Sequence, residues 1–112
     1  MFVGNYKALQ KFGKQHTCSR PSLETWCQIT LEARWRNFDD VRKTFRSADI
    51  YGDCVIFDIA GDNYGLIAFI RYDLEQVNIE TVLTHAEYDR DKWKKELGIS
   101  YGNRQADRRA KS

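Results

Sequence analysis

Residues 53–72 read DCVIFDIAGDNYGLIAFIRY, and this stretch decides the class of fold. Val55, Phe57 and Ile59 recur at every second position, which is the period of a β-strand with one buried face. Residues 61–63 (GDN) predict a tight turn, because Gly and Asn tolerate positive φ. Residues 63–72 are apolar on both faces, as in a central strand that is covered on both sides. The stretch therefore predicts a β-hairpin at the centre of a sheet.

A third strand and a helix are expected after this hairpin. Residues 76–84 alternate again, which predicts an inward face and an outward face. The inward set is Val77, Ile79, Thr81 and Leu83, and the outward set is Asn78, Glu80 and Val82. Thr84 is the expected N-cap of a helix that runs to about residue 97. The polar, basic residues 98–112 predict a mobile tail beyond a single domain of residues 1–97.

Helix signals dominate before residue 48. Residues 6–13 place apolar and basic side chains on different faces, and helices are also expected over residues 22–33 and 39–45. Ser19 or Ser22 is the expected cap of the second helix. The expected buried side chains are Leu9, Phe12, Leu23, Trp26, Cys27, Thr30, Leu31, Val41 and Phe45. The order of the expected elements, with helices first, then a hairpin-rich sheet and then a helix, predicts an α+β domain.

Composition excludes several classes of protein. The three cysteines are widely spaced and form no CxxC pair, so neither a zinc site nor a disulfide framework is indicated, and a reduced cytoplasm is expected. The longest apolar run, residues 66–70, is too short to span a membrane, and residues 1–12 do not resemble a signal peptide. We expect no metal, no other cofactor and no membrane association.

The charges divide the chain into three parts. Residues 1–47 hold nine basic residues against four acidic ones, and residues 90–112 hold eight against three. Residues 48–89 hold one against nine. Basic helices can hold a phosphate backbone, but solvated helix faces would give the same pattern. Charge alone leaves both interpretations open.

Two spaced motifs and a helical stretch carry a family resemblance. The motifs are FDIAGDNY at residues 57–64 and THAEYD at residues 84–89, and the helical stretch contains Trp35, Phe38, Val41, Phe45 and Ala48. Together they resemble the HigB branch of the RelE superfamily, over roughly residues 1–93, with THAEYD the most specific part. The resemblance implies a compact RelE-like α+β domain, with N-terminal helices packed on a mainly antiparallel sheet and a C-terminal helix.

The resemblance also implies a function, that of the toxin in a bacterial toxin–antitoxin pair. Such toxins cleave mRNA on the ribosome without a metal, through attack of a ribose 2′-hydroxyl on the adjacent phosphate. That reaction needs a base, an acid and positive charge at the phosphorane oxygens. The implied partners are a cognate antitoxin, expected to be a helix-turn-helix protein, and ribosome-bound mRNA. Operator DNA would be contacted only through the antitoxin.

His85 is the first candidate for the catalytic chemistry, because an imidazole titrates near neutral pH. Glu87 could accept a proton, or could simply favour the N-terminus of its helix through the helix dipole. Tyr88 could stack on a base or orient a phosphate, or could be a core aromatic residue. The sequence leaves these alternatives open for Glu87 and Tyr88.

Candidate RNA contacts come from several parts of the chain. Lys7, Lys11, Lys14 and Lys43 lie on the predicted helices, although exposed lysine is common on any soluble helix. Asn63 belongs to the first motif. Arg71 is the single basic residue of the acidic segment, and it either faces the site or neutralises Asp58 or Asp73.

Gly65 departs from the family pattern, which has an arginine at this place. Glycine weakens a strand and offers no charge, whereas arginine would suit bidentate contact with phosphate. Two hypotheses follow: an RNA-cleaving toxin weakened by Gly65, or a non-catalytic RNA- or protein-binding module on the same fold. A metal-dependent nuclease is disfavoured, since the sequence has neither HExxH nor paired carboxylates at a suitable spacing.

Overall fold

The hairpin predicted from residues 53–72 is the centre of the molecule. A computed structural model describes residues 1–90 and 93–94. In it, β3 (Cys54–Ile59) pairs antiparallel with β4 (Tyr64–Arg71), with Asp58 directly opposite Gly65. Ala60 and Gly61 take positive φ values of 54° and 72°. The turn therefore uses these two residues, and the expectation that Asn63 would adopt positive φ was wrong.

The sheet has five strands in the order β1-β5-β4-β3-β2, so β4 is central as predicted. β5 (Gln76–Thr84) is antiparallel to β4, whereas β1 (Phe2–Gly4) runs parallel to β5 at one edge. β2 (Asp49–Tyr51) pairs antiparallel with β3 at the other edge. The sequence did not predict β1 and β2, because three residues are too few to show the alternation of a strand.

The three N-terminal helices begin and end close to their predicted bounds. They are α1 (Tyr6–Gln15), α2 (Arg20–Glu32) and α3 (Phe38–Thr44), with short 3₁₀ turns at Thr17–Ser19 and Tyr72–Leu74. Ser19 occupies the N-cap of α2, but its hydroxyl donates to the carbonyl of His16 at 2.6 Å instead of capping the helix. Leu31, expected in the core, is 48% exposed. None of the described helices has the length and apolar character needed to cross a membrane.

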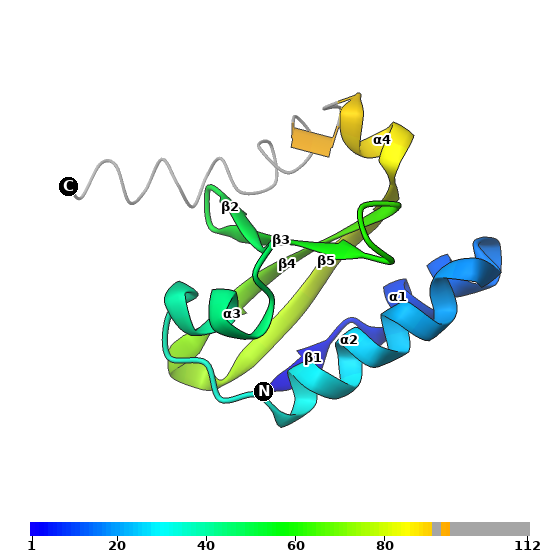
Figure 1. The fold of residues 1–112 in the computed structure, drawn as a ribbon. Helices are drawn as coiled ribbons and strands as arrows, with labels where there is room; N and C mark the ends of the chain where they lie inside the picture. The colour runs from blue at the N-terminus through cyan, green and yellow to red at the C-terminus, as the bar shows by residue number, and fades with distance from the viewer. Residues whose placement is uncertain (91–92, 95–112) are drawn as a thin grey trace.

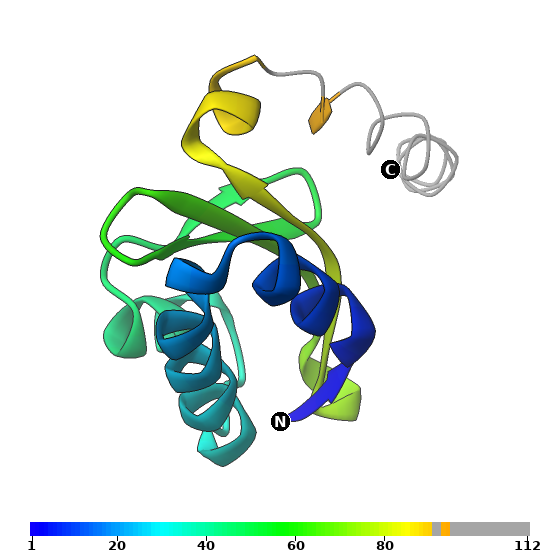
Figure 2. The ribbon, with the colours of Figure 1, turned by 90° about the vertical axis from the view of Figure 1, so that its right-hand side faces the viewer.

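The helices cover one face of the sheet, as Figure 1 shows for α1 and α2. Leu23, Trp26 and Val41 from the helices pack on Phe57 and Leu66 from the sheet to form the main core. Figure 2 shows α4 (His85–Asp89) on the other side of the sheet from this helical layer. The predicted α+β fold, with N-terminal helices on a mainly antiparallel sheet and a C-terminal helix, is confirmed.

A β-bulge changes which residues of β5 face the helices. Ile67 pairs with Thr81, but the next residue, Ala68, pairs with Ile79, so one extra residue lies in β5. An extra residue reverses the alternation of inward and outward side chains beyond it. Val82 therefore joins the main core, and the expected inward orientation of Thr81 and Leu83 was wrong.

The second face of the sheet carries a smaller apolar cluster. It contains Cys54, Ile56, Ile67 and Trp93, with Phe69, Leu83 and Tyr88 packed against it. This cluster covers β4 on its second face, as predicted for a central strand. The helix predicted to run from Thr84 to about residue 97 is shorter than expected, because α4 ends at Asp89 with Arg90 as its C-cap. The predicted tail, residues 98–112, lies outside the described residues.

Candidate functional site

A small cavity of about 80 Å³ lies where β3, β4 and α4 meet. Its lining residues come from three separate parts of the chain: Asp58, Asp62, Tyr64, Gly65, His85 and Tyr88. The cavity therefore brings together the two motifs of the sequence and the position where the sequence departs from the family pattern.

Backbone contacts explain why the two motifs meet. Thr84, the last residue of β5, pairs with Tyr64, the first residue of β4. The next residue, His85, donates its backbone N–H to the carbonyl of Asn63 at 3.0 Å. The first turn of α4 is thus held against the β3–β4 turn, and Asn63 contributes a backbone carbonyl to this junction.

The imidazole of His85 lies between two hydrogen-bond acceptors. Its Nδ1 is 3.1 Å from the carbonyl oxygen of Asp62, and its Nε2 is 3.1 Å from the Oδ2 of Asp89. Both partners are hydrogen-bond acceptors, and together they fix the orientation of the ring. The side chain is 58% exposed, so a ligand in the cavity can reach it.

Glu87 and Thr84 form a capping box at the start of α4. The hydroxyl of Thr84 accepts from the backbone N–H of Glu87 at 3.2 Å, and the carboxylate of Glu87 accepts from the backbone N–H of Thr84 at 3.0 Å. This confirms the predicted N-cap at Thr84. The Glu87 carboxylate is therefore used to stabilise the start of α4. Glu87 is not among the residues that line the cavity.

Replacing Thr84 with alanine is expected to lower the free energy of unfolding by about 1 kcal/mol, because the cap is lost. Denaturant unfolding of the purified variant measures this change. Thr84→Ser keeps the hydroxyl and is the matched control, with stability close to that of the parent. An alanine variant as stable as the serine variant would contradict the capping role.

The ring of Tyr88 lies between Gly65 and Trp93. It stacks on Trp93 with ring centroids 5.3 Å apart, and the indole N–H of Trp93 donates to the Tyr88 carbonyl at 2.9 Å. A Cβ placed on Gly65 would lie 3.4 Å from Cδ2 of Tyr88, an ordinary van der Waals distance. Tyr88 thus contributes to the second apolar cluster, as the core interpretation expected, and it also lines the cavity. Its contact with RNA stays a prediction.

The backbone at Gly65 does not require glycine. Its φ is not in the left-handed region, and the space beside it admits a side chain. Asp58, its cross-strand partner, projects from the same face of the sheet. A longer side chain at position 65 would therefore run along the Tyr88 ring with the Asp58 carboxylate beside it.

The cavity is acidic. Asp58 and Asp62 line it, and Asp89 contacts His85 from outside. Among the described residues, none of those lining the cavity is a lysine or an arginine. The described part of the chain also contains no group of three or more His, Cys, Asp or Glu side chains suited to a metal ion.

The candidate RNA contacts do not gather around this cavity. Arg71 ends β4, six residues from Gly65 and so roughly 20 Å away. Its guanidinium donates to Asp73 at 3.0 and 3.2 Å, and this hydrogen bond lowers the pKa of the Asp73 carboxyl below its usual value. The sequence left open whether Arg71 faces the site or neutralises an aspartate, and in the structure it forms an ion pair with Asp73.

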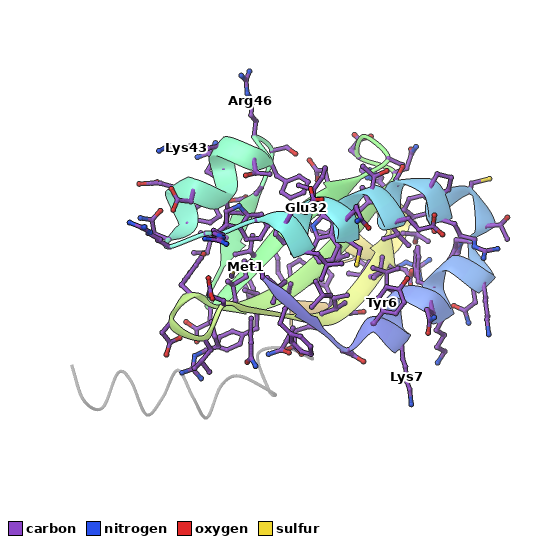
Figure 3. The ribbon with its side chains drawn as sticks, turned by 90° about the horizontal axis from the view of Figure 1, so that it is seen from below. Met1, Tyr6, Lys7, Glu32, Lys43 and Arg46 are labelled. Atoms are coloured by element: carbon purple, nitrogen blue, oxygen red, sulfur yellow. The ribbon has the colours of Figure 1, made fainter. Side chains whose placement is uncertain are left out.

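The four candidate lysines lie on two sides of the molecule. Lys7, Lys11 and Lys14 are exposed on α1, whereas Lys43 is on α3, 3.9 Å from a carboxylate oxygen of Asp40. In Figure 3, Lys7 and Lys43 point away from each other on opposite sides of the molecule. One phosphate cannot be contacted by both.

Sequence reasoning did not select Tyr64, which lines the cavity, or its neighbour His16. The ring centroids of His16 and Tyr64 are 6.1 Å apart. His16 is the C-cap of α1 and is 48 positions before Tyr64, so no spacing rule connects them. The two residues are brought together only by the packing of α1 on the sheet.

One comparison with known proteins bears on this site. A family model named HigB_toxin, described as the RelE-like toxic component of a toxin-antitoxin system, matches residues 19–91. The match spans more than half of the chain and includes Gly65, His85 and Tyr88. A search of curated proteins found no match.

Proposed function

Because this chain belongs to the HigB toxin family of RelE-like toxins in toxin–antitoxin systems, we propose that it acts on ribosome-bound mRNA as an endoribonuclease. Its antitoxin partner would hold it inactive. The observation that supports this proposal is the cavity that joins His85, Tyr88 and position 65 from separate parts of the chain. A phosphate that reacts must be held by groups on several sides, and one turn of helix cannot provide them all. Residues from both motifs together can.

The proposed reaction needs no metal. The ribose 2′-oxygen forms a bond to phosphorus while the bond from phosphorus to the 5′-oxygen breaks. The 2′-hydroxyl proton goes to a base, and a proton from an acid goes to the leaving 5′-oxygen. His85 is the titratable group in the cavity suited to proton transfer near neutral pH. Its ring nitrogens contact Asp62 and Asp89, which orient the ring at the cavity, and in this proposal His85 takes the acid step.

The other two candidates in the second motif take supporting roles in this proposal. Tyr88 forms the wall along which a phosphate or base would lie. Glu87 maintains the capping box, so it orients the first turn of α4 and with it the His85 ring. This assignment follows the helix-terminus alternative for Glu87.

Gly65 makes this chain a weak enzyme in our proposal. Transition-state charge on the phosphorane oxygens must be stabilised by donors or cations. The described cavity offers carboxylates instead, and the bare backbone at Gly65 leaves the place of the family's arginine without charge.

The acidic cavity also supports the second candidate function, a non-catalytic binding module on the same fold. The two functions differ in one simple readout. A nuclease toxin arrests bacterial growth when it is expressed without its antitoxin, whereas a non-catalytic module binds RNA or protein without producing cleaved mRNA.

The three lysines of α1 are the proposed contacts with the RNA phosphates, and α1 leads to His16, its C-cap. For single-stranded RNA, each neutralised phosphate contributes about −0.7 to the slope of log affinity against log salt. Replacing Lys7, Lys11 and Lys14 with glutamine should therefore reduce the slope by about 2. Fluorescence anisotropy with a labelled RNA oligonucleotide at several salt concentrations measures the slope.

Arg71→Gln is the matched control for this experiment, because Asp73 already engages the guanidinium at the far end of β4. Its slope should equal that of the parent chain. An unchanged slope in the triple lysine variant would show that α1 does not contact the RNA backbone.

A further inference from the structure

Three aromatic rings pack together where the C-terminal end of α1 meets the start of β4. The ring centroids of Phe12 and His16 are 4.4 Å apart, and those of Phe12 and Tyr64 are 5.5 Å apart. His16 and Tyr64 are 6.1 Å apart, which closes the triangle. Phe12 is buried, whereas His16 and Tyr64 are half-buried, so the last two present ring surface to the solvent.

The backbone of His16 is held from both sides. Its N–H donates to the carbonyl of Phe12 at 2.8 Å, and its own carbonyl accepts from the backbone N–H of Ser19 at 2.9 Å and from the Ser19 hydroxyl. Ser19 is fully buried. The backbone from which the imidazole projects is therefore fixed by hydrogen bonds on both sides.

The aromatic rings and the cavity meet at the end of the sheet, where Tyr64 begins β4. Tyr64 lines the cavity beside His85, and its ring reaches toward α1 on the helical face of the sheet. Gly65, the next residue of β4, faces the cavity from the opposite face of the sheet, so an RNA strand that reaches both places must pass around this end of the sheet. Its phosphate would then lie next to His85 and an adjoining base at Tyr64 and His16.

Charge favours approach of RNA from this side. The turn side of the cavity carries Asp58 and Asp62. The corner at His16 is flanked instead by Lys14 and Arg20, and the Arg20 side chain lies along Gly13 of α1. A polyanion is attracted toward the α1–α2 corner and repelled from the turn.

We propose that His16 and Tyr64 form a nucleobase-binding subsite beside the His85 cavity. The base of the nucleotide adjoining the reacting phosphate stacks on these rings, and Phe12 supports them from the core. This proposal rests on the proposed action on RNA. Stacking of one base on aromatic side chains changes affinity by roughly fivefold to a hundredfold, and purines should bind better than pyrimidines because they offer more surface.

The chain has only two histidines, which makes a direct test possible. Histidine ring signals of the isotope-labelled protein are recorded by NMR and assigned with His16→Gln. The probe is a trinucleotide of 2′-deoxyadenosines, which cannot be cleaved because it lacks the attacking hydroxyl. Its matched control carries the same phosphates and sugars but no bases.

We expect the base-bearing trinucleotide to shift the His16 signal through the ring current of a stacked base, while the abasic one leaves it in place. A shift of His85 alone would overturn the subsite and leave the proposed function standing. Equal shifts of His16 with both probes would also overturn it, since they would indicate phosphate contact. If neither histidine responds to either probe, both the subsite and the proposed RNA site are wrong.

A pair of variants provides a second measurement. Tyr64→Leu should weaken binding of the base-bearing trinucleotide by roughly fivefold or more, whereas Tyr64→Phe keeps a stacking ring and should bind like the parent. Neither variant should change the affinity for the abasic probe. A merely structural role of Tyr64 would instead lower the affinity for both probes together, and that result would contradict the proposal.

Discussion

Replacing Gly65 with arginine is expected to raise the rate of mRNA cleavage by roughly 10²–10³-fold, the usual effect of one transition-state contact. The backbone at position 65 accepts a side chain without strain, and the nearest atom to a new Cβ is Cδ2 of Tyr88 at 3.4 Å. The guanidinium would lie in the cavity beside His85, where it could stabilise charge on the phosphorane.

Asp58 allows a second test of the charge at position 65. It stands directly opposite Gly65, so an arginine there could form an ion pair with Asp58 instead of contacting the phosphate. We therefore expect Gly65→Arg combined with Asp58→Asn to be at least as active as Gly65→Arg alone. Gly65→Gln has a long polar side chain without charge, and it should remain as weak as the parent.

The measurement is colony survival after induction of each variant at matched soluble expression, together with primer-extension mapping of cleaved mRNA. If the glycine form kills as well as the arginine form, a charge at position 65 is not needed. The catalytic charge would then have to come from another part of the chain.

Replacing His85 with alanine is expected to abolish cleavage, both in the parent chain and in the Gly65→Arg background. His85 is the only imidazole that lines the cavity of the described structure, and its ring is held by Asp62 and Asp89. General acid–base catalysis by one positioned group typically contributes about 10²–10⁴-fold, so removing it from a weak enzyme should bring the rate to background.

His85→Gln keeps a hydrogen-bonding side chain that does not titrate, and it should be as inactive as His85→Ala. The His85 side chain is largely exposed, so neither change should alter the melting temperature by more than a few degrees. Unchanged cleavage in a folded His85→Ala variant would remove His85 from the catalytic role.

Local patterns sufficed for the centre of the fold. The alternation of Val55, Phe57 and Ile59 and the apolar run after the turn predicted β3 and β4, because a strand buried on one or both faces must show these periods. Thr84 was predicted as an N-cap because its hydroxyl satisfies backbone donors within its own turn. The two motifs also predicted the family, and the residues that they contain do meet in one cavity.

Short elements and changes of register could not be predicted this way. The edge strands β1 and β2 have three residues each and exist only because β5 and β3 offer them partners. The bulge in β5 moves Val82 inward, although the local alternation had placed it outside. In both cases the hydrogen bonds that decide the structure come from residues far away in the sequence.

The sequence by itself determined the α+β fold class, the central hairpin, the cap of α4 and the family, since each depends on neighbouring residues or on a contiguous motif. Only the tertiary structure decided the surroundings of the site. It placed Arg71 at the far end of β4, put Asp58 and Asp62 in the cavity wall, and brought His16, the C-cap of α1, next to Tyr64 of β4. These outcomes follow from how helices pack on the sheet, and contacts between distant residues carry no local period from which they could be predicted.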